Sequence, residues 1–253
     1  MKANGGDFMD TKKHVFIIIL ILSIFFLSGC AARIVRSEYT PKTSIRSLTI
    51  KKNLASIAKE PKIFVLKFQD KRMHYKEKNI DVLKSKGWDD EQVSYEDLKD
   101  PYLIFKYREN NDHRFKTKTL CDYLHESLIF DLSSLGFNIV SDKKSDLSFQ
   151  EIIKNNKIVP TNISYVIGID VLMCEPRVVA GWGQPDELFY HYYYHLKIYD
   201  VLKSKVLYDA ELNRTIEGTQ EVEVLFTTMV DKLLNDYLFE INYDVAEILV
   251  KYK

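Results

Sequence analysis

The chain has 253 residues, and its 36 basic and 36 acidic side chains give a formal net charge of zero. Apolar residues make up 46% of the sequence, which is enough for a folded core and excludes the collagen-like, coiled-coil and wholly disordered classes. A balanced charge offers no basic surface for a phosphate backbone, so we expect no nucleic-acid partner. The chain has three cysteines, an odd number that cannot all pair within one exported chain.

An apolar run of 13 residues, interrupted only by Ser23, extends from Val15 to Leu27 and follows Lys12 and Lys13. A membrane-spanning helix needs about 20 apolar residues, whereas a run of about 10 to 14 is typical of the core of a signal peptide. A plain apolar anchor is the alternative. We interpret residues 1–29 as a signal peptide because the charge, the length and the flanking residues agree.

The run ends in Leu27, Ser28, Gly29 and Cys30, which resemble a bacterial lipobox. The resemblance implies that a signal peptidase recognises Leu27, Ser28 and Gly29, and that Cys30 begins the mature chain. Cys30 would then carry a covalent diacylglycerol and an N-linked acyl chain such as palmitate, and we expect no other cofactor. At about 0.8 kcal/mol per buried methylene, several acyl chains anchor a protein without a transmembrane helix. Ala31, where lipoproteins retained at the inner membrane have Asp, implies an outer-membrane location that faces the periplasm.

Removal of the signal peptide leaves 224 residues with 33 basic and 34 acidic side chains. Because Cys30 accounts for the odd count, Cys121 and Cys174 remain in an oxidising compartment. One alternative is a disulfide between them, and the other is a pair of buried free thiols.

Residues 30–60 are mostly polar, and we predict a lipidated tether in which residues 44–50 could add an edge strand. Residues 61–253 are predicted to form one domain. Its first strand is expected at 62–68, where β-branched and aromatic residues gather. A charged insertion at about 71–114 follows, with a short helix near 89–98 and a strand near 103–107. We interpret it as a solvated surface excursion in preference to a binding element.

A helix is predicted from Thr117 or Thr119 to Gly136, because leucines recur on one face and glycine favours the left-handed end of a helix. A short strand at 137–140 and a second helix at about 146–155 follow. This order predicts a strand–helix–strand crossover between parallel strands.

Three strands are expected next. The first, 165–173, alternates in side-chain character and should break at Glu175 and Pro176. The second, 187–200, has an apolar face and an amphipathic face that we expect to be wet. A turn at Lys203 leads into a third strand at 205–215. The predicted apolar face of the second strand comprises Leu188, Tyr190, Tyr192, Tyr194, Leu196 and Ile198.

Residues 219–250 are predicted to form a long helix with a break near Asn242, since apolar residues recur three and four apart. The predicted fold class is therefore α+β: a mostly antiparallel sheet of four to five strands packed by two main helices, preceded by a lipoprotein signal peptide and tether.

Few residues indicate chemistry. His191 and His195 are four apart on one strand and thus about 13 Å apart, too far for one metal ion, so no metal site is predicted. Cys121 and His125 share a helix face but lack a third orienting group. Asp170 is expected in a salt bridge or at a sheet edge, in preference to a role as an acid. The common motifs of acyl transfer and phosphate binding are absent, so we expect a protein that is not an enzyme.

Aromatic residues instead suggest a contact with a protein partner in the envelope. Trp182 lies in a loop with two glycines and Pro185, where an aromatic side chain favours docking, although packing back onto its own domain is the alternative. The amphipathic face of strand 187–200 adds further candidates, which are Phe189, His191, Tyr193 and His195.

The chain order resembles periplasmic lipoproteins with a fold like the amino-terminal domain of TolB, including the YajG type and auxiliary lipoproteins of ABC-type lipid transport systems. The resemblance covers most of residues 62–250. It implies a non-enzymatic protein and transfers no catalytic residue. The motifs are the lipobox, the strand end Phe68 to Arg72, the helix end Leu135 to Phe137, and the hairpin of Ile198 to Asp200 with Lys205 to Tyr208.

The main hypothesis is an outer-membrane lipoprotein that serves as a docking or assembly accessory for an envelope complex. One alternative is an auxiliary subunit of a lipid transport or secretion apparatus. Another is a structural link to peptidoglycan. The sequence leaves the oligomeric state open.

Overall fold

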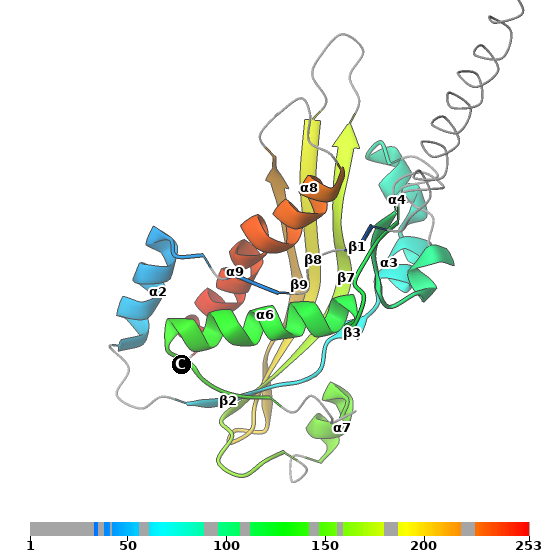
Figure 1. Cartoon of the computed structure of the whole chain (residues 1–253). Coiled ribbons are helices and arrows are strands. Elements are labelled where there is room, and N and C mark those ends of the chain that lie inside the picture. The colour runs from blue at the N-terminus through cyan, green and yellow to red at the C-terminus, as the bar shows by residue number, and fades with distance from the viewer. Residues whose placement is uncertain are drawn as a thin grey trace, which may run out of the picture.

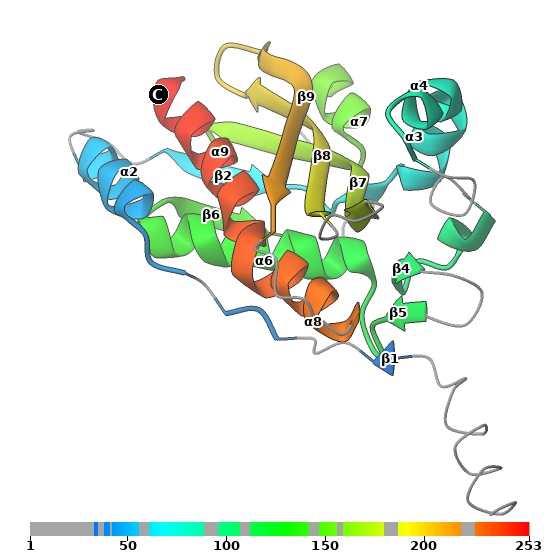
Figure 2. The same cartoon turned by 90° about the horizontal axis from the view of Figure 1, so that it is seen from above.

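The computed structural model describes residues 33–34, 38–40, 42–55, 61–88, 96–106, 112–141, 147–155, 159–179, 187–218 and 226–252. A twisted central sheet has α6 (Leu120–Leu135) and the C-terminal helices on its inner face, as Figure 1 shows. Helices α3 (Arg72–Lys78), α4 (Ile80–Ser85) and α7 (Phe149–Lys154) lie on its outer face (Figure 2). The predicted α+β class is confirmed.

The central sheet has six strands, in place of the predicted four to five. Its order is β6-β2-β7-β8-β9, and β3 pairs with β7 as well. The long β7, β8 and β9 are antiparallel, whereas β2, β3 and β6 form parallel pairs at one side. The bounds are β2 Lys62–Val65, β3 Gln69–Asp70, β6 Asn138–Ser141, β7 Tyr165–Val179, β8 Glu187–Asp200 and β9 Lys205–Glu217.

Helix α6 follows its predicted boundaries. Thr119 accepts a hydrogen bond from the backbone N–H of Asp122, whose side chain accepts one from the Thr119 N–H in return. Gly136 ends the helix at a φ of 102°, a conformation that glycine adopts without strain. Helix α7 lies between β6 and β7, which both pair in parallel with β2, so the predicted crossover is confirmed. A similar capping box at Ser148 begins α7.

The C-terminal helical region comprises α8 (Phe226–Asp231), a π-helical segment η4 (Lys232–Tyr237) and α9 (Leu238–Lys251). The predicted break near Asn242 was therefore wrong, because the irregular segment lies one turn or more earlier. Asn242 fits inside α9 because its amide donates to the buried Asp131 carboxylate at 2.8 Å.

The predicted apolar face of β8 is confirmed. Tyr190, Tyr192 and Tyr194 are fully buried against α6 and the C-terminal helices, together with Leu196 and Ile198. The Tyr192 hydroxyl donates to the backbone oxygen of Leu233. These large rings form the centre of the main hydrophobic core.

Strand β7 continues through Pro176 to Val179, so the predicted break was wrong. Beyond Val171, β7 pairs with β8 but no longer with β3. Pro176 has no backbone N–H to donate, and it is tolerated here because this part of β7 pairs with only one strand among the described residues. The register shifts between Val171 and Met173, as at a β-bulge. As a result, Met173 lies opposite Tyr193 on the outer face, whereas Val171, two residues earlier, packs in the main core on the inner face.

The insertion contributes α3, α4, a 3₁₀ turn η2 (Glu96–Lys99), β4 (Leu103–Lys106) and β5 (Asp112–Arg114). The predicted strand corresponds to β4, whereas α3 and α4 were not predicted. A second sheet has the order β1-β5-β4, with β1 spanning Arg33–Ile34. The expected solvated surface excursion is wrong for this part, because Arg72, Lys76 and Leu83 are buried.

Helix α2 (Ile45–Ala55) lies within the predicted tether, where an edge strand at 44–50 was considered. Its residues Ile50 and Leu54 are 2% and 4% exposed and join the main core. Residues 30–60 are therefore not wholly a tether, because burial of apolar side chains holds this helix on the domain.

Candidate docking surface

The described residues between β1 and α2 contact the domain at several points. The hydroxyl of Tyr39 donates to the Asp131 carboxylate at 2.6 Å. The hydroxyl of Tyr243 donates to the backbone oxygen of Lys42 at 2.6 Å, and the Lys42 ammonium pairs with Asp236 at 2.9 Å. The described residues between β1 and α2 therefore contact α6 through Tyr39 and the C-terminal helices through Lys42.

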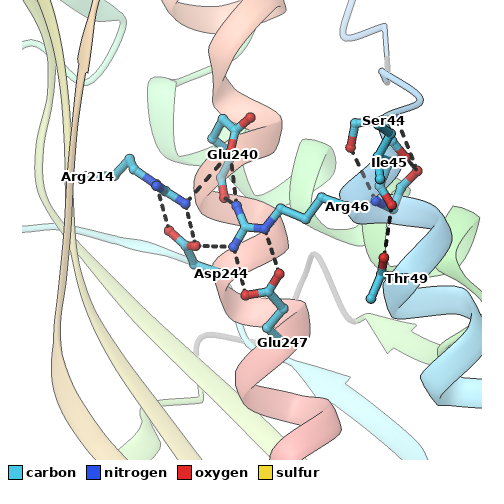
Figure 3. Close-up of polar contacts among 9 residues, drawn as sticks. Ser44, Ile45, Arg46, Thr49, Arg214, Glu240, Asp244 and Glu247 are labelled. Carbon is cyan, nitrogen blue, oxygen red and sulfur yellow. Dashed lines mark hydrogen bonds and ion pairs between the residues drawn. The ribbon is translucent and has the colours of Figure 1, made fainter.

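An arginine clamp then holds α2 against α9, as Figure 3 shows. The Arg46 guanidinium pairs with Glu240 at 2.9 Å, with Glu247 at 2.6 Å, and with Asp244. Arg214 of β9 shares Asp244 at 2.7 Å. Hydrogen bonding to Arg46 holds the pKa of Glu247 below its ordinary value. Two guanidinium groups thus pair with three carboxylates on one face of α9, so the clamp joins α2, α9 and β9.

On the outer face of the sheet, His191 does not lie in water as expected. Its ring is 6% exposed, because the Trp88 ring packs over it at a centroid distance of 5.1 Å. Its Nδ1 lies 3.1 Å from the Thr215 hydroxyl, and its Nε2 has no partner among the described residues. The predicted contact through His191 is therefore corrected, since the α4 end of the insertion covers this ring.

Two charged residues of β7 hold Trp88 in place. The Arg177 guanidinium lies 5.1 Å from the Trp88 ring centroid and donates to the backbone oxygen of Gly87 at 2.7 Å. Below the ring, the buried Lys76 pairs with Glu175 at 2.8 Å. Burial lowers the pKa of His191 to about 4, and the charges of Arg177, Lys86 and Lys76 act in the same direction.

Sequence reasoning missed this cluster. Lys76 and Glu175 are separated by 99 positions, so no local pattern joins them. The sequence signal that could have indicated it was Trp88, which follows Gly87 in a charged segment. A large aromatic side chain in such a segment is expected to be buried against another part of the domain.

Between α3 and α7, no described helix or strand covers the outer face of the sheet. We call this surface the open strip, and it consists of Asp170, Tyr193, His195, Lys197, Asp209 and Glu211. His195 Nε2 lies 2.6 Å from Asp209, and the Lys197 ammonium lies 2.6 Å from Asp170. The predicted salt bridge of Asp170 is confirmed. Tyr193 is half-buried beside Tyr75, at a centroid distance of 6.2 Å, and Phe189 is half-buried at the other end of the face.

A pocket of about 250 Å³ adjoins the open strip. Its floor includes Gly168, where an added Cβ would lie 2.9 Å from the Phe149 ring, so glycine allows α7 to approach the sheet. Lys67 and Lys71 at its rim form no ion pair with any described residue. The pocket and the open strip together present a charged surface on a rigid sheet.

The thiol and imidazole groups that suggested chemistry are parts of the core. Cys121 and Cys174 are buried free thiols, so the structure contains no disulfide between them. Burial raises the pKa of Cys174 to about 12, and burial also raises the pKa of Cys121. His125 is buried, with Nε2 at 3.4 Å from the backbone oxygen of Val65. Neither thiol is therefore a thiolate at neutral pH.

Some predicted residues lie outside the described ranges. These are the lipobox, Leu27 to Cys30, and Trp182. Within the described part of the chain, no three His, Cys, Asp or Glu side chains gather as metal ligands. Among the same residues, no helix has the length and apolar character needed to cross a membrane.

No family model and no curated protein matches the chain. It aligns with a Xanthomonas campestris protein of the DUF330 family at a TM-score of 0.46 and 10% identity, covering 87% of this chain and 92% of that one. A neuraminyllactose-binding hemagglutinin homologue from Helicobacter pylori aligns at 0.36 and 10%, covering 84% and 92%. Lipoprotein GNA1162 from Neisseria meningitidis aligns at 0.30 and 9%, covering 74% and 99%. Identities and TM-scores this low assign neither a family nor a function, and the resemblance to TolB-like lipoproteins stays a prediction.

Proposed function

We propose that the chain is a lipid-anchored protein of the bacterial envelope that acts by binding, as a docking or assembly accessory at the outer membrane. The observation that carries this proposal is the sequence Leu27 to Cys30 directly after a 13-residue apolar run. Three acyl chains on Cys30 anchor the mature chain durably, because two or more chains are needed for stable membrane binding.

The state of the titratable groups supports binding as the mode of action. The Cys121 thiol is buried and protonated, and the Asp170 carboxylate is paired with Lys197. The open strip, by contrast, presents alternating charges on adjacent strands, where side chains are held at fixed spacing. Such a surface provides electrostatic complementarity, which determines specificity and the rate of association.

The lipid anchor is tested by labelling cells with palmitate and measuring the intact mass of the mature protein. The wild type is expected to incorporate label and to start at Cys30 with a diacylglycerol and an acyl chain. Cys30→Ser should take up no label and leave the membrane fraction. An unmodified Cys30 in a processed or full-length chain would overturn the proposal.

The docking surface is tested by photo-crosslinking from His195 and Glu211, which lie on the open strip. We expect both positions to give an adduct with the same envelope protein. A matched control is Leu202, which is 82% exposed in the β8–β9 turn and lies away from the strip. Charge reversal by Asp209→Lys should remove the adduct. Adducts that are equal from Leu202, or that consist only of copies of this chain, would contradict docking through the strip.

The Trp182 loop gives a second test. We predict that Trp182→Ala weakens the partner interaction and leaves the thermal midpoint almost unchanged, because an aromatic docking residue acts only in the complex. Trp88→Ala is the matched control and should lower stability. A large loss of thermal midpoint for Trp182→Ala would show that this tryptophan packs on its own domain.

A further inference from the structure

The structure places the attachment of the chain to its own domain very near Cys30. Strand β1 begins at Arg33, only three residues after Cys30, and pairs in parallel with β5 through Arg33 with His113 and Ile34 with Arg114. A chain spans at most about 3.6 Å per residue, so the Cα atoms of Cys30 and Arg33 are at most about 11 Å apart.

The attachments beyond β1 prevent the rest of the segment from acting as a long tether. The Tyr39 hydroxyl donates a hydrogen bond to Asp131, and the ion pairs of Arg46 hold α2 on α9. If the two-residue strand β1 separated from β5, the chain from Cys30 to Tyr39 would still span at most about 30 Å between the two Cα atoms.

We infer that one corner of the domain lies against the membrane in which the acyl chains of Cys30 are inserted. This corner is formed by the β1-β5-β4 sheet and η2. This inference rests on the proposed lipid anchor and adds an orientation to it. The β8–β9 turn then lies away from the membrane, because Figures 1 and 2 both show this turn far from β1.

The corner carries charges of both signs, because η2 contains Glu96 and Asp97 beside Lys99, and Arg114 pairs with Asp100 at 3.1 Å and with Asp112 at 2.6 Å. Its exposed tyrosine and lysines suit a lipid headgroup layer. Tyr102, immediately before β4, is 41% exposed. Its backbone oxygen accepts a hydrogen bond from the backbone N–H of Phe115 at 3.0 Å, and the exposed Lys116 follows Phe115. Lys99 and Lys116 form no ion pair with any described residue, so both ammonium groups are available to lipid phosphates. Tyrosine is favoured at membrane interfaces because its ring is apolar and its hydroxyl is polar.

The inference is tested with single fluorophores on the lipidated protein in vesicles of phosphatidylethanolamine and phosphatidylglycerol. Lys116→Cys carries the label near the corner, and Leu202→Cys carries it in the distant turn. Cys121 and Cys174 are buried, and Cys30 is blocked by its lipid, so labelling is selective. With a quencher on the lipid headgroup, we expect several-fold stronger quenching at position 116 than at position 202.

A variant with about 20 glycine and serine residues inserted between Ala32 and Arg33 provides the control. Such an insert adds a root-mean-square length of about 25 Å, so quenching at position 116 should fall toward that at position 202. Equal quenching at the two positions in vesicle-bound protein, or no effect of the insert, would overturn the orientation alone. Protein that carries no lipid and does not bind vesicles would overturn the proposed anchor together with the orientation.

Discussion

His191 lies on the outer face of β8 near the charges of Arg177, Lys86 and Lys76, yet it is buried, and its Nε2 lacks a partner among the described residues. Its pKa is lowered to about 4 by burial first and then by nearby cations. The ordinary value for histidine is about 6.5, so between these values the unfolded chain binds a proton that the folded chain does not. The contribution of His191 to the free energy of unfolding is therefore lost as the pH falls from 6.5 to 4.

We predict that the wild type loses about 3 kcal/mol of its free energy of unfolding over this range through His191, at 1.36 kcal/mol per pH unit. His191→Gln should show a correspondingly flatter profile in urea unfolding measured from pH 7 to pH 4. Leu202→Gln, at an exposed residue that carries no titratable group, is the control and should keep the wild-type profile. An unchanged slope in His191→Gln would contradict the role of burial.

Asp131 behaves in the opposite direction. Burial raises its pKa, although hydrogen bonds from Tyr39 and Asn242 act against this effect. A raised folded pKa means that the contribution to stability is fully present below the unfolded value of about 3.9 and is lost as the pH rises through the folded value.

We predict that Asp131→Asn, which keeps an oxygen acceptor without the charge, gains stability relative to the wild type as the pH rises from 4 to 7. Asp131→Leu removes the acceptor and should lose about 1–3 kcal/mol at both pH values, since Tyr39 and Asn242 are left with buried donors. Chemical unfolding at the two pH values measures both effects. A constant difference between Asp131→Asn and the wild type would be inconsistent with a raised pKa.

Among the elements, the α3–α4 part of the insertion acts as a cover for the sheet. Trp88 is 6% exposed and contacts His191 and Arg177 across the interface. We predict that Trp88→Ala costs about 3–5 kcal/mol, the usual loss for a large buried aromatic side chain. Differential scanning calorimetry measures the loss. Val82→Ala, at a residue that is 51% exposed on α4, should cost far less.

Helix α2 depends on the clamp as well as on its apolar contacts. We predict that Arg46→Gln destabilises α2 by about 1–3 kcal/mol, because it leaves three partly exposed carboxylates with Arg214 alone. Hydrogen exchange of the α2 amides should accelerate. Adding Glu240→Gln and Asp244→Asn should recover part of the loss, because these changes remove the repulsion. Lys42→Gln, at an exposed pair, is the control and should change little.

At the scale of the whole molecule, the two buried cysteines report global unfolding. Cys121 and Cys174 lie on α6 and β7 and join the same core cluster. We predict that neither thiol is alkylated in the native mature protein and that both are alkylated in denaturant without a reductant. The alkylation rate should follow the global free energy of unfolding, as for buried amides in a core. Failure of both thiols to react in denaturant would indicate a disulfide.

The sequence by itself determined the elements whose signals are local. The capping residues of α6, the alternating tyrosines of β8 and the turn at Lys203 each predicted an element that the structure contains. Such signals depend on helix and strand periods and on backbone preferences of a few residues, so they can be recognised without knowledge of the partners in the fold.

Only the tertiary structure decided which faces are covered and where β1 and α2 attach to the domain. The bulge at Val171, the burial of His191 under Trp88, and the clamp of Arg46 on α9 all join residues far apart in sequence. A histidine such as His191 is stable on a strand face that is exposed to water and also on one that is covered by an aromatic ring. A polar segment such as residues 45–55 is compatible with an extended tether and also with a helix held by ion pairs. The choice depends on what packs against it, because burial and ion pairing are properties of the pair and not of either residue alone.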